Sequence, residues 1–344
     1  MSRLWVGRQR MEHRQHRNTA QPNSTILQER TSRKILLLKP NFSLPYTYSI
    51  PGLSMIAATL SRTLRNATRI IFVMAMLWSG AYAQGERKID IGECRLHIVE
   101  SGAGSPVVVF ESGLGEDVAT WADVQSKVAS FTHTVAYDRA GIGQSDPARR
   151  PRTMGAMAAD LHSLLRAGKI PPPYILVGHS LGGTLVQMFA HSYPAEVAGL
   201  VLVDPEDRQL PDRLRSHMTA EEWAAREKAL GEALPKMPPA VQAEMNAMMD
   251  SGRSEKDVLP LPRVPVILLT GTKKNPEFPG NPLEQDLKLE LHNELLKRIP
   301  DNRHVLAPDS RHYIQNDSPQ LVIDAIHDIV SRWPSKARPE LPRK

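Results

Sequence analysis

The chain contains a serine within a sequence motif that exposes nucleophiles. Ser180 is the third residue of a Gly-x-Ser-x-Gly pentad that runs from Gly178 to Gly182. Four apolar residues, Tyr174 to Val177, precede the pentad and are typical of a buried strand, and apolar residues recur at helical spacing after it. A strand, a sharp turn and a helix are the context in which this pentad presents a serine hydroxyl to an acyl carbon. We therefore predict that Ser180 is a catalytic nucleophile.

The two glycines that flank this serine have an expected steric role. A serine in so tight a turn has a strained backbone, and the neighbouring strand and helix come close to it. We expect that a side chain at Gly178 or Gly182 would collide with them. The pentad should therefore tolerate no larger residue at either position.

A histidine near the C-terminus is the candidate general base. His312 follows the last expected strand, His304 to Ala307, and precedes a helix that Ser318 can cap. A base in this position could take the proton of Ser180 during acylation and later deprotonate the water that releases the acyl group. We therefore predict that His312 is the partner of Ser180.

The chain between these residues alternates between strands and helices. From Gln84 onward, short apolar runs typical of strands are separated by stretches of helical spacing. This alternation predicts an α/β fold with a mostly parallel sheet, helices on both faces, and the carboxyl ends of the strands along one edge. Ser180, Asp204 and His312 each follow a strand, so we expect them to meet at that edge. The expected strands are Lys88–Ile91 and Cys94–Glu100, which form an opening hairpin, then Val107–Phe110, Val135–Tyr137, Tyr174–Val177, Gly199–Val203, Val264–Thr270 and His304–Ala307.

Two segments resemble a known family. The stretches Gly178-His-Ser-Leu-Gly-Gly183 and Tyr137-Asp-Arg-Ala-Gly-Ile-Gly-Gln-Ser-Asp146 are similar to segments of the α/β-hydrolase fold serine hydrolases, a group of esterases, lipases and related acyl-transfer enzymes. The order of serine, acid and histidine along the chain is also that of this fold. The resemblance implies an α/β-hydrolase fold with a small helical cap inserted late in the sheet. It also implies catalysis through an acyl-enzyme intermediate.

The resemblance implies two backbone donors for an oxyanion hole. By position they are the amide of Leu114, within Glu111 to Gly115, and the amide of Leu181, directly after Ser180. Glycines beside Leu114 suit this role, because a tetrahedral oxyanion must come within about 3 Å of two preorganised amides. The chain departs from the commoner His-Gly form of this loop, since it has Ser112-Gly113.

The acid of the triad has one predicted position and two alternatives. Many members of the resembled family have the acid as Gly-x-x-Asp after the strand that here ends at Thr270, but this chain has Lys274 there and no carboxylate before Glu277. Asp204 lies in an Asp-Pro pair one strand earlier, which resembles the acid of the pancreatic-type lipases of this fold. We predict Asp204 as the acid, with Glu277 and Glu206 as alternatives. Removing the acid should impair catalysis with little change in folding.

The basic residues of the chain are concentrated at its N-terminal end. The 344 residues carry a formal net charge of +6, but residues 1–83 contain 12 Lys and Arg and only 2 Asp and Glu, so the rest is mildly acidic. We therefore expect no nucleic-acid partner. Cys94 is the only cysteine, which rules out an intramolecular disulfide bond.

A secretory signal accounts for this basic end. Three arginines precede the apolar run Ile70–Trp78, and an Ala-x-Ala sequence ends at Ala83. We predict a signal peptide over residues 55–83 and a mature protein that begins at Gln84. Residues 1–54 are then disordered or a mis-assigned start. The expected location is the periplasm or the outside of the cell, and the apolar run is too short to favour stable insertion in a membrane.

Residues from about 206 to 262 interrupt the alternation. Thr219-Ala-Glu-Glu222 has the pattern of a capping box, and apolar residues at helical spacing predict a second helix around Met245. In the resembled family, an insertion here is the cap. Its methionines either line an apolar acyl pocket or pack the cap onto the body. We expect residues 84–344 to form one α/β-hydrolase domain that includes this cap.

The sequence thus predicts an exported serine hydrolase that cleaves a small-molecule carboxylic ester through a Ser-His-Asp triad. An amidase, peptidase or lactonase with the same triad is the first alternative, and a catalytically inactive binding protein of this fold is the second. We expect no metal and no cofactor, because the chain has no His-Glu-x-x-His, paired cysteines, Walker loop or complete Gly-x-Gly-x-x-Gly after a strand. A serine in the pentad also argues against the dehalogenase and epoxide-hydrolase branches, which the resemblance would give a carboxylate nucleophile.

Overall fold

The structure is a computed structural model that describes residues 85–250, 260–274 and 281–333. All of these residues belong to a single unit of the chain, residues 81–344. The predicted signal peptide, the segment before it and Glu277 lie outside the described residues. Within these ranges, no helix combines the length and the hydrophobicity needed to cross a membrane.

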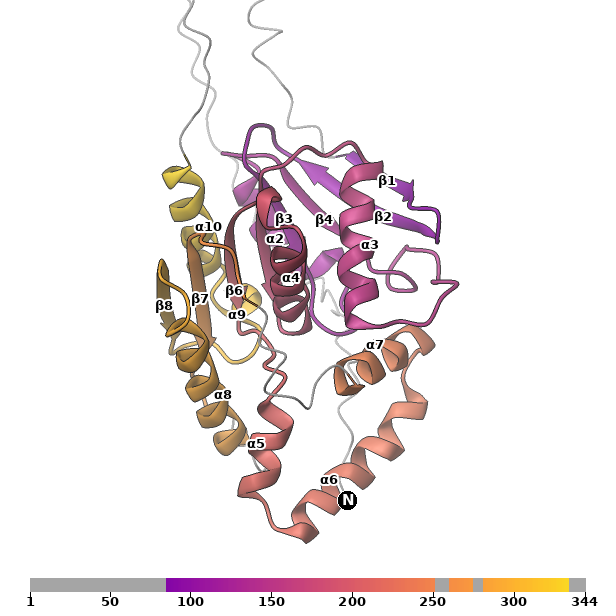
Figure 1. The fold of residues 1–344 in the computed structure, drawn as a ribbon, viewed down its shortest axis with the longest axis vertical. Helices are drawn as coiled ribbons and strands as arrows, with labels where there is room; N and C mark the ends of the chain where they lie inside the picture. The colour runs from indigo at the N-terminus through magenta and orange to yellow at the C-terminus, as the bar shows by residue number, and fades with distance from the viewer. Residues whose placement is uncertain (1–84, 251–259, 275–280, 334–344) are drawn as a thin grey trace, which may run out of the picture. The chain divides into compact units, whose positions relative to one another are not determined.

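Eight strands form one mostly parallel sheet, as predicted (Figure 1). Their order across the sheet is β1-β2-β4-β3-β5-β6-β7-β8. The first two strands form the expected antiparallel hairpin, β2 and β4 are also antiparallel, and all later neighbours are parallel. The strands are β1 Gly85–Asp90, β2 Arg95–Ser101, β3 Val107–Glu111, β4 Thr134–Tyr137, β5 Tyr174–His179, β6 Val197–Val203, β7 Val266–Gly271 and β8 Asn302–Ala307.

Helices cover both faces of the sheet. Figure 1 shows α3 and α4 side by side in front of the sheet, and α2 and α10 pack on its other face. The helices of the body are α2 Ala122–Val128, α3 Met154–Ala167, α4 Leu181–Ser192, α8 Asn281–Leu296, α9 Ile314–Asp317 and α10 Pro319–Arg332. Two short 3-10 helices, η1 Val118–Trp121 and η2 Pro194–Glu196, join body elements.

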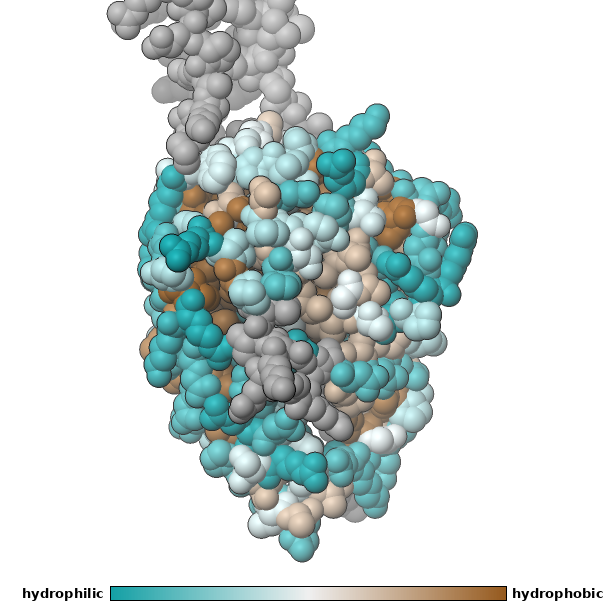
Figure 2. All heavy atoms as spheres, viewed as in Figure 1, coloured by the Kyte–Doolittle hydropathy of each residue, from teal (hydrophilic) through white to brown (hydrophobic). Residues whose placement is uncertain are grey.

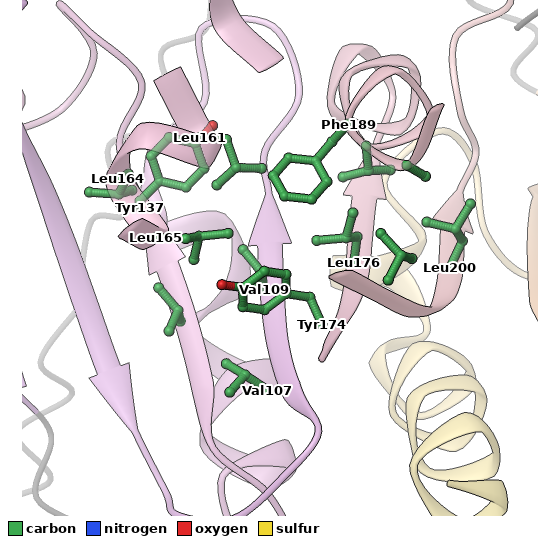
Figure 3. Close-up of a cluster of buried hydrophobic side chains, with 14 of the residues drawn as sticks. Val107, Val109, Tyr137, Leu161, Leu164, Leu165, Tyr174, Leu176, Phe189 and Leu200 are labelled. Atoms are coloured by element: carbon green, nitrogen blue, oxygen red, sulfur yellow. The ribbon is translucent and has the colours of Figure 1, made fainter. Parts of the chain in front are cut away.

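The central strands are apolar throughout because both of their faces are buried. Side chains alternate between the faces with the period of two of a strand. Val107 and Val109 of β3 join the cluster under α3 and α4, whereas Val108 and Phe110 join the cluster under α2 and α10. Figure 3 shows Leu161 and the other labelled leucines of α3 within the first of these clusters.

Hydrophilic and hydrophobic residues are distributed unevenly over the surface. On the face shown in Figure 2, hydrophilic residues dominate the margins, and the hydrophobic residues that reach the surface lie in separate patches among them. Among the described residues, the large hydrophobic side chains that remain exposed are Leu306 and Trp333. The apolar runs recognised in the sequence are therefore used to build the core.

The cap follows β6, as expected, and lies at the lower end of Figure 1. Thr219 and Glu222 form the predicted capping box at the start of α6. Helix α6 buries none of its residues, whereas α7 buries Glu244 and Ala247. Met248 packs with Ala247 against an apolar cluster of the body, so this methionine joins the cap to the body. The cap elements are α5 Leu210–His217, α6 Ala220–Ala233, the 3-10 helix η3 Leu234–Lys236 and α7 Pro239–Asp250.

Candidate active site

Ser180 occupies the sharp turn between β5 and α4. Its backbone has φ 52° and ψ −120°, a left-handed conformation that is strained for a residue with a side chain. A Cβ at Gly178 would collide with the carbonyl oxygen of Gly182, and a Cβ at Gly182 would collide with that of Glu111. The close approach expected from the sequence is therefore present. The surrounding elements hold Ser180 at the end of the strand.

Asp204 lies beside Ser180 because the strands that carry them are in register. His179 of β5 pairs with Val203 of β6, so Ser180 and Asp204 each stand one residue beyond the paired ends. The amide of Ser180 donates to the carbonyl oxygen of Val203 at 3.2 Å, and the carbonyl oxygen of Ser180 accepts from the amide of Glu206 at 3.0 Å. Two parallel strands thus place the serine and the carboxylate at one edge, as predicted.

A short hydrogen bond joins Asp204 to His312. Nδ1 of His312 lies 2.6 Å from Oδ2 of Asp204, and Oδ1 of Asp204 accepts from the amide of Gly271 at 3.1 Å. The Asp204 side chain is 3% exposed, while that of His312 is 34% exposed. Among the described residues, Nε2 of His312 has no hydrogen-bond partner, and the carboxylate of Glu206 makes no bond to His312. The structure therefore brings the predicted base together with the first of the predicted acids.

A lysine that the sequence did not single out completes this cluster. Lys288 of α8 is 9% exposed, and its Nζ lies 3.1 Å from Oδ2 of Asp204 and 3.4 Å from Nδ1 of His312. Leucines of α8 recur at helical spacing, a pattern that indicates the buried side of this helix. They gave no sign that the lysine next to Leu287 would reach the carboxylate.

The charges of this cluster are mutually dependent. Burial opposes ionisation of Asp204, but Lys288 and His312 outweigh burial and hold the pKa of Asp204 well below its usual range. Burial also opposes the charge of Lys288, yet Asp204 and Glu206 raise its pKa above the ordinary value. Partial burial and the ammonium of Lys288 lower the pKa of His312 to about 4. The imidazole is therefore neutral, and able to act as a base, at neutral pH.

His179 of the pentad contacts the loop that carries His312. One ring nitrogen, Nε2, lies 3.0 Å from the carbonyl oxygen of His312, and the other, Nδ1, lies 3.1 Å from Oε2 of Glu116. The two histidine rings are 4.6 Å apart between centroids. The predicted base is thus held next to the residue that immediately precedes Ser180.

The glycine loop, residues 112–116, is fixed by Arg139. This guanidinium uses all five of its N–H groups: they donate to the carbonyl oxygens of Ser112 at 2.6 Å and Gly113 at 2.5 Å, to Glu111 at 2.8 Å, and to both oxygens of Glu244 at 2.6 and 2.9 Å. Arg139 belongs to the Tyr-Asp-Arg run, one of the two segments that resemble the α/β-hydrolase fold serine hydrolases. Glu244, from α7 of the cap, was not recognised, because nothing in the sequence marks it as a partner of that run.

The bonds of the glycine loop leave one amide free. The amide of Gly113 donates to Glu116 at 2.9 Å, and the amide of Gly115 donates to Glu244 at 3.0 Å. Among the described residues, neither the Leu114 amide between them nor the Leu181 amide at the start of α4 has a hydrogen-bond acceptor. These are the two amides predicted as oxyanion donors. Unpaired, rigidly held donors are what such a hole requires.

The match to a family model agrees with this geometry. A model described as the α/β hydrolase fold matches residues 106–248, a range that contains the pentad and Asp204. This match and the eight-stranded sheet show that the chain has the α/β-hydrolase fold.

Several known proteins are similar to this chain. The uncharacterized protein YqjL of Bacillus subtilis (strain 168) is 29% identical over 249 residues, which cover 71% of this chain and 91% of YqjL. A thermophilic esterase from Thermogutta terrifontis has a TM-score of 0.51 and 23% identity, over 71% of this chain and 97% of the esterase. The serine hydrolase CarC, involved in carbazole degradation, has a TM-score of 0.54 and 20% identity, over 72% of this chain and 99% of CarC. At these identities the two solved structures show a shared fold and nothing further.

Proposed function

We propose that this protein is an exported serine hydrolase that cleaves carboxylic esters of small molecules, with Ser180 as nucleophile, His312 as base and Asp204 as acid. The observation that carries the proposal is the 2.6 Å hydrogen bond between Nδ1 of His312 and Asp204, beside the turn that holds Ser180. The two free amides of Leu114 and Leu181 support it.

Acylation follows from the position of the hydrogen on His312. A nitrogen 2.6 Å from a carboxylate oxygen carries the hydrogen, so the lone pair of the neutral ring is on Nε2. Nε2 would take the proton of Ser180 while Oγ attacks the ester carbonyl carbon. The resulting oxyanion would accept hydrogen bonds from the amides of Leu114 and Leu181.

Deacylation reverses the proton transfers. When the tetrahedral intermediate collapses, the imidazolium gives its proton to the leaving alcohol, and the acyl group stays on Oγ as an ester. A water molecule then loses a proton to Nε2 and attacks this acyl-enzyme. The second intermediate releases the carboxylic acid and returns the proton to Ser180. Asp204 stays ionised throughout and stabilises the imidazolium.

The side chains beside the oxyanion donors are apolar, which supports an apolar acyl group. Leu181 belongs to a buried cluster with Met154, Met157 and Leu185, and Leu114 packs against it. This cluster forms an apolar region next to the two amides. An acyl chain that binds there would be removed from water without the burial of unpaired polar groups.

A fluorophosphonate probe tests the proposal. We expect the protein to be labelled, the Ser180→Ala variant to lose labelling, and the matched variant Ser126→Ala, changed in α2, to keep it. A panel of p-nitrophenyl esters of rising chain length, with the corresponding anilides, should show hydrolysis of esters with short and medium chains. An unlabelled wild-type protein would indicate a binding protein instead, and faster cleavage of the anilides would indicate an amidase.

Export makes a separate prediction about the mature end. Because Ala81 and Ala83 fit the small −3 and −1 positions of a signal cleavage site, protein recovered from outside the cytoplasm should begin at Gln84 or within about two residues of it. N-terminal sequencing of the exported protein measures this directly. Recovery of exported protein that retains residues 1–54 would contradict the proposed signal.

A further inference from the structure

Lys288 is buried against the two titratable members of the proposed triad. Its Nζ lies 3.1 Å from Oδ2 of Asp204, the same oxygen that Nδ1 of His312 contacts at 2.6 Å. A buried ammonium is unfavourable unless a negative charge compensates it, and Asp204 is the ion-pair partner that the structure gives to Lys288. The lysine and the carboxylate are therefore mutually dependent. The orientation of Asp204 is fixed from one side by Lys288 and from the other by Gly271.

The contact between Lys288 and His312 joins two donors. Nδ1 of His312 uses its hydrogen on Asp204, so it has no lone pair to offer, and an ammonium has only hydrogens. The 3.4 Å separation is therefore not a productive hydrogen bond. Lys288 acts on the imidazole through its charge, which opposes the formation of an imidazolium beside it.

We propose that Lys288 is a positioning residue of this site, which holds the carboxylate of Asp204 and places a positive charge beside the imidazole of His312. The inference rests on the proposed function. Its consequence is that the hydrolase keeps its activity at a pH where a Ser-His-Asp triad without such a cation is inactivated by protonation of the histidine.

Burial and the neighbouring His179 ring also oppose a positive charge on His312, whereas the remaining groups around it do not. Asp204 favours the imidazolium and so acts in the opposite direction. Glu116 also carries negative charge, and it lies on the far side of the His179 ring, to which it is bonded. Tyr313, next in the chain, has its pKa raised to about 12 by burial and is neutral throughout the relevant range. Lys288 is the cation that the described residues place within 4 Å of the imidazole.

The negative charge that surrounds the ammonium of Lys288 decreases as the pH falls. Burial raises the pKa of Glu206 to about 7, although the charge of Lys288 acts to lower it. Glu206 therefore becomes neutral in acidic solution. Burial lowers the pKa of His292 to about 4, so this ring is neutral over most of the range. Glu284 carries the remaining nearby negative charge. Between about pH 4 and pH 7, Lys288 thus depends increasingly on Asp204 for compensation.

The pH dependence of kcat/KM tests the proposal. This quantity reports the protonation of the free enzyme, so its acidic limb follows His312. The wild-type limb should lie near pH 4, because activity is lost as the pH falls through the lowered pKa of His312. In Lys288→Met, a neutral variant of similar length, the limb should move to higher pH by about one unit or more. Lys288→Arg retains the charge and should keep the limb near its wild-type position.

The control is Lys274→Met, which removes an exposed lysine paired with Asp286 and should not move the limb. Equal loss of activity at every pH in Lys288→Met, or a shift of the limb to lower pH, would overturn the proposal. Titration of the His312 imidazole by NMR in the wild-type full chain gives a second readout that needs no variant. A midpoint near the ordinary value of about 6.5 would also overturn it.

The failure of this inference and of the proposed function are distinguishable. If Ser180 reacts with the fluorophosphonate but Lys288→Met leaves the acidic limb of kcat/KM unchanged, only the role of the lysine is refuted. A protein whose Ser180 does not react would refute the hydrolase proposal, whatever the NMR titration shows.

Discussion

Asp204→Asn is expected to lower kcat for ester hydrolysis on the order of 10⁴-fold. The asparagine amide can donate where the carboxylate accepted, which favours the tautomer of His312 that carries its hydrogen on Nε2. In that tautomer the ring cannot take the proton of Ser180. Steady-state kinetics with a p-nitrophenyl ester measure the loss. The matched variant Glu277→Gln should keep almost full activity, and the reverse order would assign the acid to Glu277.

The same substitution should also destabilise the fold, contrary to the expectation from the sequence. Asp204→Asn leaves the buried ammonium of Lys288 without its ion-pair partner, which should lower the free energy of unfolding by about 3–5 kcal/mol. Chemical denaturation of the two proteins measures this difference. The double variant Asp204→Asn with Lys288→Met should recover part of the stability and none of the activity. Equal stability of wild type and Asp204→Asn would mean that Lys288 finds another partner.

Ser180→Ala and His312→Ala should each abolish most of the activity, on the order of 10⁶-fold in kcat. The serine cannot attack without the base, and the base has no function in catalysis without the serine. The double variant should therefore be only slightly less active than either single variant. The comparison requires kcat for all four proteins under the same conditions, with thermal unfolding to confirm that each is folded.

Losses that multiply in the double variant would show that the two residues act independently. In that case His312 would not be the base for Ser180. The same outcome would leave the hydrogen bond between His312 and Asp204 without a catalytic role, and the proposed mechanism would have to be replaced.

The sheet could be predicted because its signals are local. The apolar run before Ser180 and the helical spacing after it are short-range patterns, and the right-handed crossover rule then places Ser180 and Asp204 at the same edge. His312 could be placed for the same reason, since it follows the last strand. The structure extends the predicted strands by one or two residues at several ends, for example to Val197 in β6. Such ends depend on pairing with neighbours more than on residue type.

The supporting residues of the site could not be predicted because their roles depend on contacts distant in sequence. Lys288 reaches Asp204 across 84 positions, and Glu244 reaches Arg139 across 105. Periodicity indicates which side of a helix is buried. It does not indicate which polar residue on that side meets a charge from another element. A charged residue inside an apolar stripe, as Lys288 is in α8, is the one signal that could have directed attention to it.

The link between Arg139 and Glu244 constrains any redesign of substrate specificity. Exchanging the cap for one from another hydrolase is a direct way to change the surroundings of a nucleophile. The junctions for such a graft would lie after β6 and before β7. Here a graft that lacked a carboxylate at the position of Glu244 would remove one of the two carboxylates that pair with the buried Arg139. It would leave two N–H groups of Arg139 without acceptors and would release the amide of Gly115. A transplanted cap must therefore carry this glutamate. Loops remote from α7 are the safer places to introduce variation.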